Sequence, residues 1–284
     1  MRERKLHLLT NDIIFGEAPR WHENRLWFSD IKDHKVKAVD ERGVLETVLV
    51  IDGDPSGLGW LPGGELLVVS MLDHRLLKWD TNVLSEVARV GEYCGGLLND
   101  MVVDRFGRAY IGNIGFDPQV QPLQLNTTNL IRVDPNGLVK VVASEILCPN
   151  GMAITPDAKT LLVSQSASTD LLAFDLDGKG DLHNRRLYAR LPEGVTYDGI
   201  CIDAENAVWV ASPTTNEFLR IKEGGRITDR IGSGDAIAVA CMLGGADRRT
   251  LFCLTSNLPL HEASQLGDSQ IQYVEVSVPG VGWP

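Results

Sequence analysis

The stretch PNGMAITPDAKTLLVS, residues 149–164, contains the repeating unit that decides the fold. It places an oxygen-bearing side chain, Asn150, four residues before an apolar position, Ile154. A polar turn and a short β-rich run, Leu161–Ser164, follow. Aligned on the position of Asn150, the chain contains six such units, separated by 39, 43, 51, 48 and 40 residues. Their anchor positions are Glu17, Ser56, Asn99, Asn150, Asp198 and Ala238.

A strand-rich repeat of roughly 40–50 residues is typical of a β-propeller blade, so six units predict an all-β, six-bladed β-propeller. The segments near Leu6–Leu9 and Ile271–Val278 are expected to share one blade and close the ring, which removes open strand edges. We expect a single domain over residues 1–284, with a sandwich or a β-helix as the alternative. The predicted strand in the middle of each unit is Leu26–Ser29, Leu66–Ser70, Ala109–Gly112, Leu161–Ser164, Val208–Ala211 or Leu251–Leu254.

Composition excludes several classes of partner. The chain has 38 acidic and 27 basic residues, a formal net charge of -11, and therefore lacks the basic footprint of a nucleic-acid-binding protein. No apolar run approaches the ~18 residues of a membrane span, and the N-terminus has no apolar core of a secretory signal. Five irregularly spaced cysteines predict reduced thiols and a cytoplasmic protein. The sequence leaves the oligomeric state open.

The anchor positions predict a metal site. In a propeller the first strand of each blade lines the central channel, so six equivalent anchors form a ring at one mouth. Two carboxylates and two amides make an all-oxygen set, for which Ca²⁺ is the first choice and Mg²⁺ or Mn²⁺ the alternatives. Zn²⁺ is a further alternative, although it usually recruits His or Cys. Asn150-Gly151 and Asp198-Gly199 are also ordinary turn dipeptides. Glu17 is a poor turn former, and four units agree in register, which favours ligands.

Five motifs resemble one known family. They are EAPRW at 17–21 with LWFSDI at 26–31, LNDMVVD at 98–104, PNGMAITPD at 149–157, YDGICID at 197–203 and NRR at 184–186. In this order and spacing the chain resembles the senescence-marker-protein/gluconolactonase/luciferin-regenerating-enzyme family over nearly its whole length. The resemblance implies a six-bladed propeller with one divalent metal in the channel and hydrolysis of a small-molecule lactone.

The resemblance also implies residue roles. Glu17, Asn150 and Asp198 match the family's metal ligands, and Asp198 matches the proposed general base. Asn99 matches the channel asparagine that contacts substrate or a metal-bound water. One position departs from the sugar-lactone members, since Leu97 stands where they have Arg, a side chain suited to polyhydroxylated or anionic substrates. Leu97 therefore favours a less polar lactone or ester, and Phe116 is expected either to add an aromatic wall or to belong to a blade core.

The mechanism expected from these residues is Lewis-acid activation of the lactone carbonyl by the metal, with Asp198 orienting or deprotonating water and Asn99 holding the carbonyl or water. Two alternatives stay open. One is another enzyme on the same scaffold, such as a strictosidine-synthase-like enzyme, a phosphotriesterase or an isomerase. The other is a non-catalytic binding propeller, since a fold does not fix a function. His261 is a further candidate base.

Overall fold

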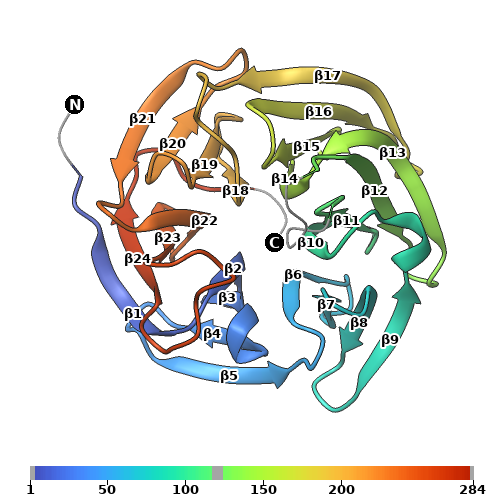
Figure 1. Cartoon of the computed structure of the whole chain (residues 1–284), viewed down its shortest axis with the longest axis horizontal. Helices are drawn as coiled ribbons and strands as arrows, with labels where there is room; N and C mark the ends of the chain where they lie inside the picture. Colours follow the sequence, from blue (N-terminus) through green and yellow to red (C-terminus); the bar gives the residue numbers. More distant parts are fainter. Residues whose placement is uncertain (1–3, 117–123, 282–284) are drawn as a thin grey trace.

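The structure is a computed structural model that describes residues 4–116 and 124–281. Within these residues it contains six four-stranded antiparallel sheets arranged as blades around a central channel (Figure 1). The predicted six-bladed propeller is therefore confirmed. Two short 3-10 turns, η1 (Ile31–Asp33) and η2 (Gly91–Tyr93), are the helical elements of the described segments.

The strands follow one another from the channel outward in five of the blades. Blade 1 contains β2 (Gly16–His22), β3 (Arg25–Asp30), β4 (Lys35–Val39) and β5 (Leu45–Val50), and blade 2 contains β6 (Pro55–Trp60), β7 (Leu66–Ser70), β8 (Arg75–Trp79) and β9 (Leu84–Arg89). Blade 3 contains β10 (Leu98–Val103), β11 (Ala109–Asn113), β12 (Thr127–Val133) and β13 (Val139–Leu147), and blade 4 contains β14 (Pro149–Ile154), β15 (Thr160–Gln165), β16 (Asp170–Leu176) and β17 (Leu182–Arg190). Blade 5 contains β18 (Ile200–Ile202), β19 (Val208–Ser212), β20 (Glu217–Ile221) and β21 (Ile227–Gly232).

Blade 6 joins the two ends of the chain. Its strands β22 (Ile237–Gly244), β23 (Thr250–Ser256) and β24 (Ser269–Glu275) are completed on the outside by β1 (His7–Ile13). The register pairs His7 with Tyr273 and Ile13 with Ser269. This is the predicted closure, in which segments from both ends of the sequence share one sheet.

The hydrophobic core lies between neighbouring blades rather than in one central mass. Five of six buried clusters combine residues of two adjacent blades, and the sixth, which contains Trp21 and Phe252, combines blades 6 and 1 with Met71 of blade 2. Both faces of the inner strands are therefore buried. This explains continuous apolar runs such as β7, all five residues of which are buried, instead of a strict alternation of apolar and polar residues.

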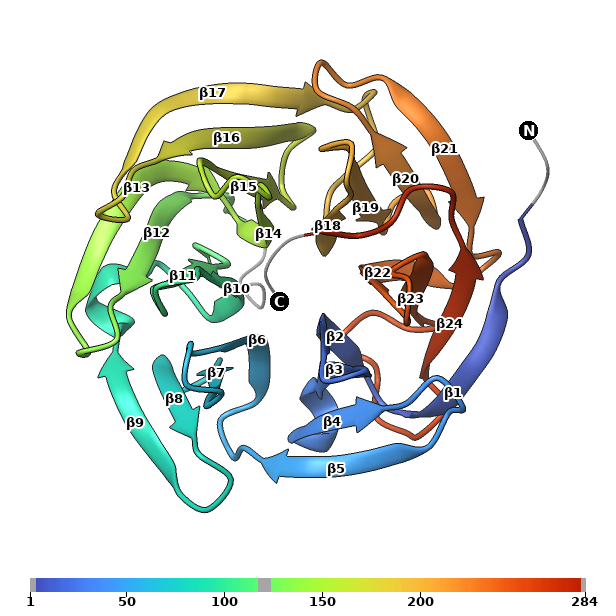
Figure 2. The same cartoon turned by 180° about the vertical axis from the view of Figure 1, so that it is seen from behind.

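At the end of the channel opposite the anchors, residues 276–281 lead from β24 inward to β18. Figure 2 shows this segment running toward the centre of the ring. Gly280 forms an isolated bridge with Asp203, and the Gly280 N–H donates to the Arg248 carbonyl at 2.7 Å. No helix in the described part of the chain has the length and apolarity needed to cross a membrane. All five cysteines lie in described positions, and each is free.

Candidate metal centre

The anchor residues lie together at one end of the channel, each at the start of an inner strand. Glu17, Asn99 and Asn150 are the second residues of β2, β10 and β14, and Asp198 precedes β18 by two residues. The two other anchors, Ser56 and Ala238, are the second residues of β6 and β22 and are buried. The repeat therefore places all six positions at equivalent points of the blades.

A shared irregularity of the backbone directs these side chains. In β2, β6, β10, β14 and β22 the pairing with the second strand shifts just after the anchor, as between Glu17 and Arg20 or Pro149 and Met152. Such a shift bends the strand and re-aims a side chain. Gly151 is needed here because a Cβ would lie 2.6 Å from the Asp198 carbonyl oxygen and the Ile200 nitrogen. The strand of Asn150 thus packs directly on the backbone of Asp198.

Asn150 and Asp198 are in direct contact. The Asn150 Nδ2 donates to Asp198 Oδ1 at 2.5 Å and to Ser166 Oγ at 2.9 Å. Asn150 is buried, and its Oδ1 has no hydrogen-bond partner. A buried acceptor without a donor is costly unless a ligand or an ion completes it. The Asn150 Oδ1 is therefore an amide oxygen that is free to bind an ion or another ligand.

The carboxyl groups of the site repel one another. Burial and the nearby Asp198 carboxylate raise the pKa of Glu17 well above its usual value, although the Ala18 N–H donates to Glu17 Oε2 at 2.8 Å. Burial raises the pKa of Asp198 to about 8; its bond from Asn150 lowers it, and Asp100 raises it further. Burial also raises the pKa of Asp100. Raised carboxyl pKa values mean that the metal-free site disfavours its own negative charge.

An ion pair that the sequence analysis missed crosses the channel beside these carboxylates. The Arg20 Nη2 donates to Asp100 Oδ1 at 2.7 Å and to the Met101 carbonyl, and both charged side chains are 4% exposed. Arg20 belongs to blade 1 and Asp100 to blade 3, so this cross-channel pair joins blades that are not neighbours. The signal was present, since both residues lie inside the quoted motifs EAPRW and LNDMVVD.

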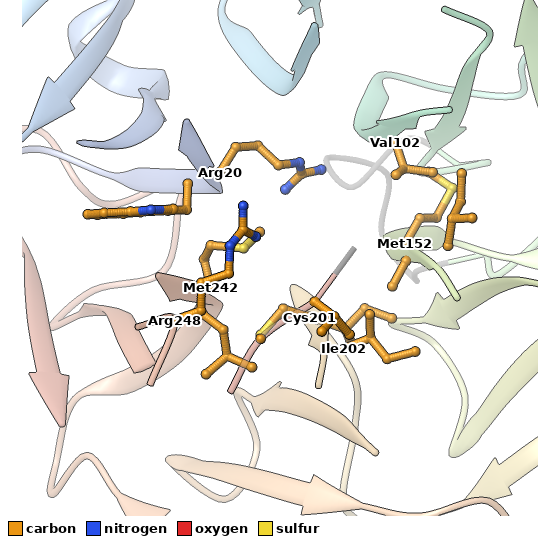
Figure 3. A pocket seen from close by; sticks show the side chains of 14 residues that line it. Arg20, Val102, Met152, Cys201, Ile202, Met242 and Arg248 are labelled. Atoms are coloured by element: carbon orange, nitrogen blue, oxygen red, sulfur yellow. The ribbon is translucent and has the colours of Figure 1, made fainter. Parts of the chain in front are cut away.

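Beyond the cross-channel pair the channel is narrow. Figure 3 shows a cavity that Arg20, Met152 and Met242 line, together with residues at the far ends of the inner strands. Gly280 and Val281 of the terminal segment also line it, and its volume is about 40 Å³. Ligand pockets usually measure several hundred Å³. A substrate therefore has to reach the anchors from the mouth at which they lie.

The donor set fits a divalent cation. Glu17 and Asp198 supply carboxylate oxygens, and the Asn150 Oδ1 supplies an amide oxygen, which are ligands of hard cations. With Asp100 and Arg20 counted, three negative charges and one positive charge leave -2, which a divalent ion neutralises. Among the described residues no group of three His, Cys, Asp or Glu side chains has metal-binding geometry. The candidate set is thus two carboxylates and an amide.

The predicted substrate-contacting residues lie at the same mouth. The half-buried Asn99 donates from Nδ2 to the Pro149 carbonyl at 3.5 Å, next to Asn150. Leu97 is half-buried, and its carbonyl accepts from the Ile114 N–H at 2.8 Å. Phe116 is half-buried, and its backbone passes so close to Gly96 that a Cβ there would lie 2.7 Å from the Phe116 oxygen. Asp117, which follows it, lies outside the described residues.

His261 is less favourably placed for catalysis. Its side chain is 79% exposed and lies 3.4 Å from Glu262 Oε1 in the loop between β23 and β24. No contact links it to Glu17, Asn150 or Asp198 among the hydrogen bonds and ion pairs of the described residues. The loop nevertheless belongs to the mouth side of the channel.

The six-bladed propeller, with candidate oxygen ligands at one mouth, defines a class of protein. Comparison with known proteins identifies the family within this class. The model of the SMP-30/gluconolactonase/LRE-like region matches residues 15–257, so the chain belongs to this family, as its motifs predicted. A 6-deoxy-6-sulfogluconolactonase from Pseudomonas putida is 26% identical over 282 residues, which cover 95% of this chain and 94% of that protein.

Two solved structures support the fold. A luciferin-regenerating enzyme matches with a TM-score of 0.84 at 20% identity, covering 99% of this chain and 98% of the other. The calcium-binding protein regucalcin from Agrobacterium tumefaciens matches with a TM-score of 0.82 at 19% identity, covering 99% and 97%. The family thus includes a lactonase.

Proposed function

We propose that this chain is a hydrolase that opens a neutral, weakly polar lactone or ester with the help of one divalent cation, Ca²⁺ in the first place. The observation that supports it most is the Asn150 Oδ1, a buried acceptor without a partner on a side chain that contacts Asp198, whose carboxylate repels that of Glu17. Membership of a family that includes a lactonase supports the reaction class.

Glu17, Asn150 and Asp198 would hold the cation. When bound, the ion supplies Lewis-acid polarisation of the substrate carbonyl and stabilises the charge that develops on its oxygen. Asp198 orients the attacking water and accepts its proton. Asn99 holds the carbonyl or the water through its amide, from a position next to Asn150. The cross-channel pair lies between the site and the narrow far end of the channel.

An apolar wall on the side of blades 1 to 3 supports a weakly polar substrate. Leu97 and Ile114, joined by their backbone bond, pack onto the cluster that includes Phe15 and Met71. A bidentate partner for a sugar hydroxyl or an anionic group is missing where Leu97 lies. The alkyl part of a lactone or ester would bury its surface here.

Removal of metal tests the proposal. A panel of lactones and esters, from gluconolactone to alkyl-substituted lactones, is followed with a pH indicator before and after treatment with EDTA. We expect acid release to vanish with EDTA and to return with Ca²⁺, Mn²⁺ or Mg²⁺. Full activity in verified metal-free protein would exclude the mechanism. A silent panel with bound metal would favour another enzyme on this scaffold, and a silent panel without metal a binding propeller.

The substitution Glu17→Gln tests the ligand set directly. We expect the affinity for Ca²⁺, measured by calorimetry, to fall by more than the ~10–100-fold that loss of an outer partner of a metal site costs. The physical reason is loss of one of the two anionic ligands. Glu193→Gln is the matched control, because Glu193 is exposed in the loop before β18. Unchanged affinity in Glu17→Gln would remove Glu17 from the site.

A further inference from the structure

Ser166 makes a contact with the site that none of the predicted ligands explains. It is half-buried and follows β15 directly. Its Oγ accepts from the Asn150 Nδ2 at 2.9 Å, while the same Nδ2 donates its other proton to Asp198 Oδ1. Both amide protons of Asn150 are therefore used. The amide plane is fixed, and Oδ1 is left without a partner.

The orientation of the Asn150 amide decides whether it can be a ligand. If the amide were rotated by half a turn, its oxygen would point toward the Asp198 carboxylate. Its NH₂ group, a hydrogen-bond donor, would then point toward the cation. A carboxylate that binds a cation turns its charge toward that ion, which weakens its bond to Asn150. Ser166 has no such competing role. In the cation-bound site, Ser166 would remain the acceptor for the Asn150 Nδ2.

The backbone fixes Ser166 relative to Asn150. The Ser166 N–H donates to the Cys148 carbonyl at 3.1 Å, two residues before Asn150. Gln165 adds two bonds from its side chain, accepting from the Leu147 N–H at 3.0 Å and donating to the Asp170 carbonyl at 3.2 Å. These hydrogen bonds fix the turn that contains Ser166 next to the start of β14.

The same strand also supports Asp198. Ser164, two residues earlier and hence on the same face of β15, is fully buried, and its Oγ donates to the Asp198 carbonyl at 3.0 Å. One strand of blade 4 thus supports an amide of its own blade and the backbone of blade 5. The two serines have different partners. Ser164 donates to a main-chain carbonyl, whereas Ser166 accepts from the side chain of Asn150, which faces the channel.

We infer that Ser166 is a positioning residue that sets the metal affinity of the site by holding the Asn150 Oδ1 toward the cation. This rests on the proposed function, since it concerns the same site. The hydroxyl group acts only as an acceptor toward the Nδ2. Its loss lets the amide rotate, so that the ligand oxygen faces the cation for only part of the time.

The test measures Ca²⁺ and Mn²⁺ affinity by calorimetry without substrate, together with the unfolding midpoint of metal-free protein. We expect Ser166→Ala to weaken binding by about 10–100-fold, as outer partners of metal ligands do, and to leave the metal-free midpoint near that of the wild type. Ser166→Thr, which keeps the hydroxyl, should restore the affinity. Ser168→Ala is the matched control in the same turn, because Ser168 Oγ accepts from the Asp170 N–H instead.

The same substitution in an Asn150→Asp variant distinguishes a positioning role of Ser166 from a general loss of structure. In Asn150→Asp the carboxylate presents an oxygen in either orientation, so Ser166→Ala should then change the affinity by less than about twofold. Wild-type affinity in Ser166→Ala, or an equal loss in both backgrounds, would overturn the inference while Glu17→Gln still tests the proposed function. A wild-type protein that binds neither ion would overturn both.

Discussion

Asp198→Asn is expected to lower kcat/KM for the best lactone by about 10²–10⁴-fold, the usual contribution of a general base, and further through the lost metal ligand. At the same time the metal-free protein should become more stable, by about 0.5–2 kcal/mol at neutral pH. The reason is that burial raises the pKa of Asp198 to about 8, so that folding without metal has to place an unfavourable carboxylate in the site.

The gain in stability depends on pH in a definite direction. The pKa of Asp198 is raised from 3.8 in the ordinary case to about 8 in the fold, so the carboxyl group destabilises the metal-free protein increasingly as pH rises between these values. The advantage of Asp198→Asn should therefore be largest near pH 8 and vanish near pH 4. Thermal unfolding in EDTA at several pH values measures it. Asp247→Asn, at a 69% exposed aspartate, is the control. A destabilised metal-free Asp198→Asn would contradict the electrostatic account.

Leu97→Arg is expected to invert the substrate preference. For an alkyl-substituted lactone kcat/KM should fall by about 10–200-fold, because apolar contact is lost and a charge must be desolvated. For a polyhydroxylated or anionic lactone it should rise, since the guanidinium offers a planar pair of donors close to Asn99. The ratio of the two constants is the quantity to measure.

Two further variants make this substitution interpretable. Leu97→Met keeps the apolar surface and should leave the preference unchanged. Leu72→Arg places the same charge on a 48% exposed leucine in the neighbouring β7–β8 loop, and it should change neither constant. An unchanged preference in Leu97→Arg with an intact unfolding midpoint would show that the apolar wall does not contact the substrate.

Most of the fold follows from local sequence. The six second strands extend the predicted runs by at most a few residues, as Leu161–Ser164 becomes β15 (Thr160–Gln165), because apolar runs buried on both faces give a strong signal. The outermost strands of blades 1 to 5 were not predicted individually. In β17 (Leu182–Arg190) a run of five exposed residues shows why, since an outer strand has little apolar surface to mark it.

The candidate site, too, could be predicted from the sequence only in part. The repeat predicts that Glu17, Asn150 and Asp198 share one mouth, because equivalent blade positions converge by symmetry. Repeat position does not identify Ser166, which lies in a turn and acts through one side-chain bond. Nor does it pair Arg20 with Asp100, since a contact between blades 1 and 3 depends on how far a side chain extends across the channel.

The Arg20–Asp100 pair gives the proposed reaction a single entrance. Since the far end of the channel offers a cavity of only about 40 Å³, the opened product leaves by the route through which the lactone entered. Hydrolysis creates a carboxylate that the substrate lacks, and this new charge arises beside Glu17, Asp100 and Asp198. A bound divalent cation, together with Arg20, balances the charge of these three carboxylates, so the site carries no surplus of positive charge that would retain the hydroxy acid and slow its release.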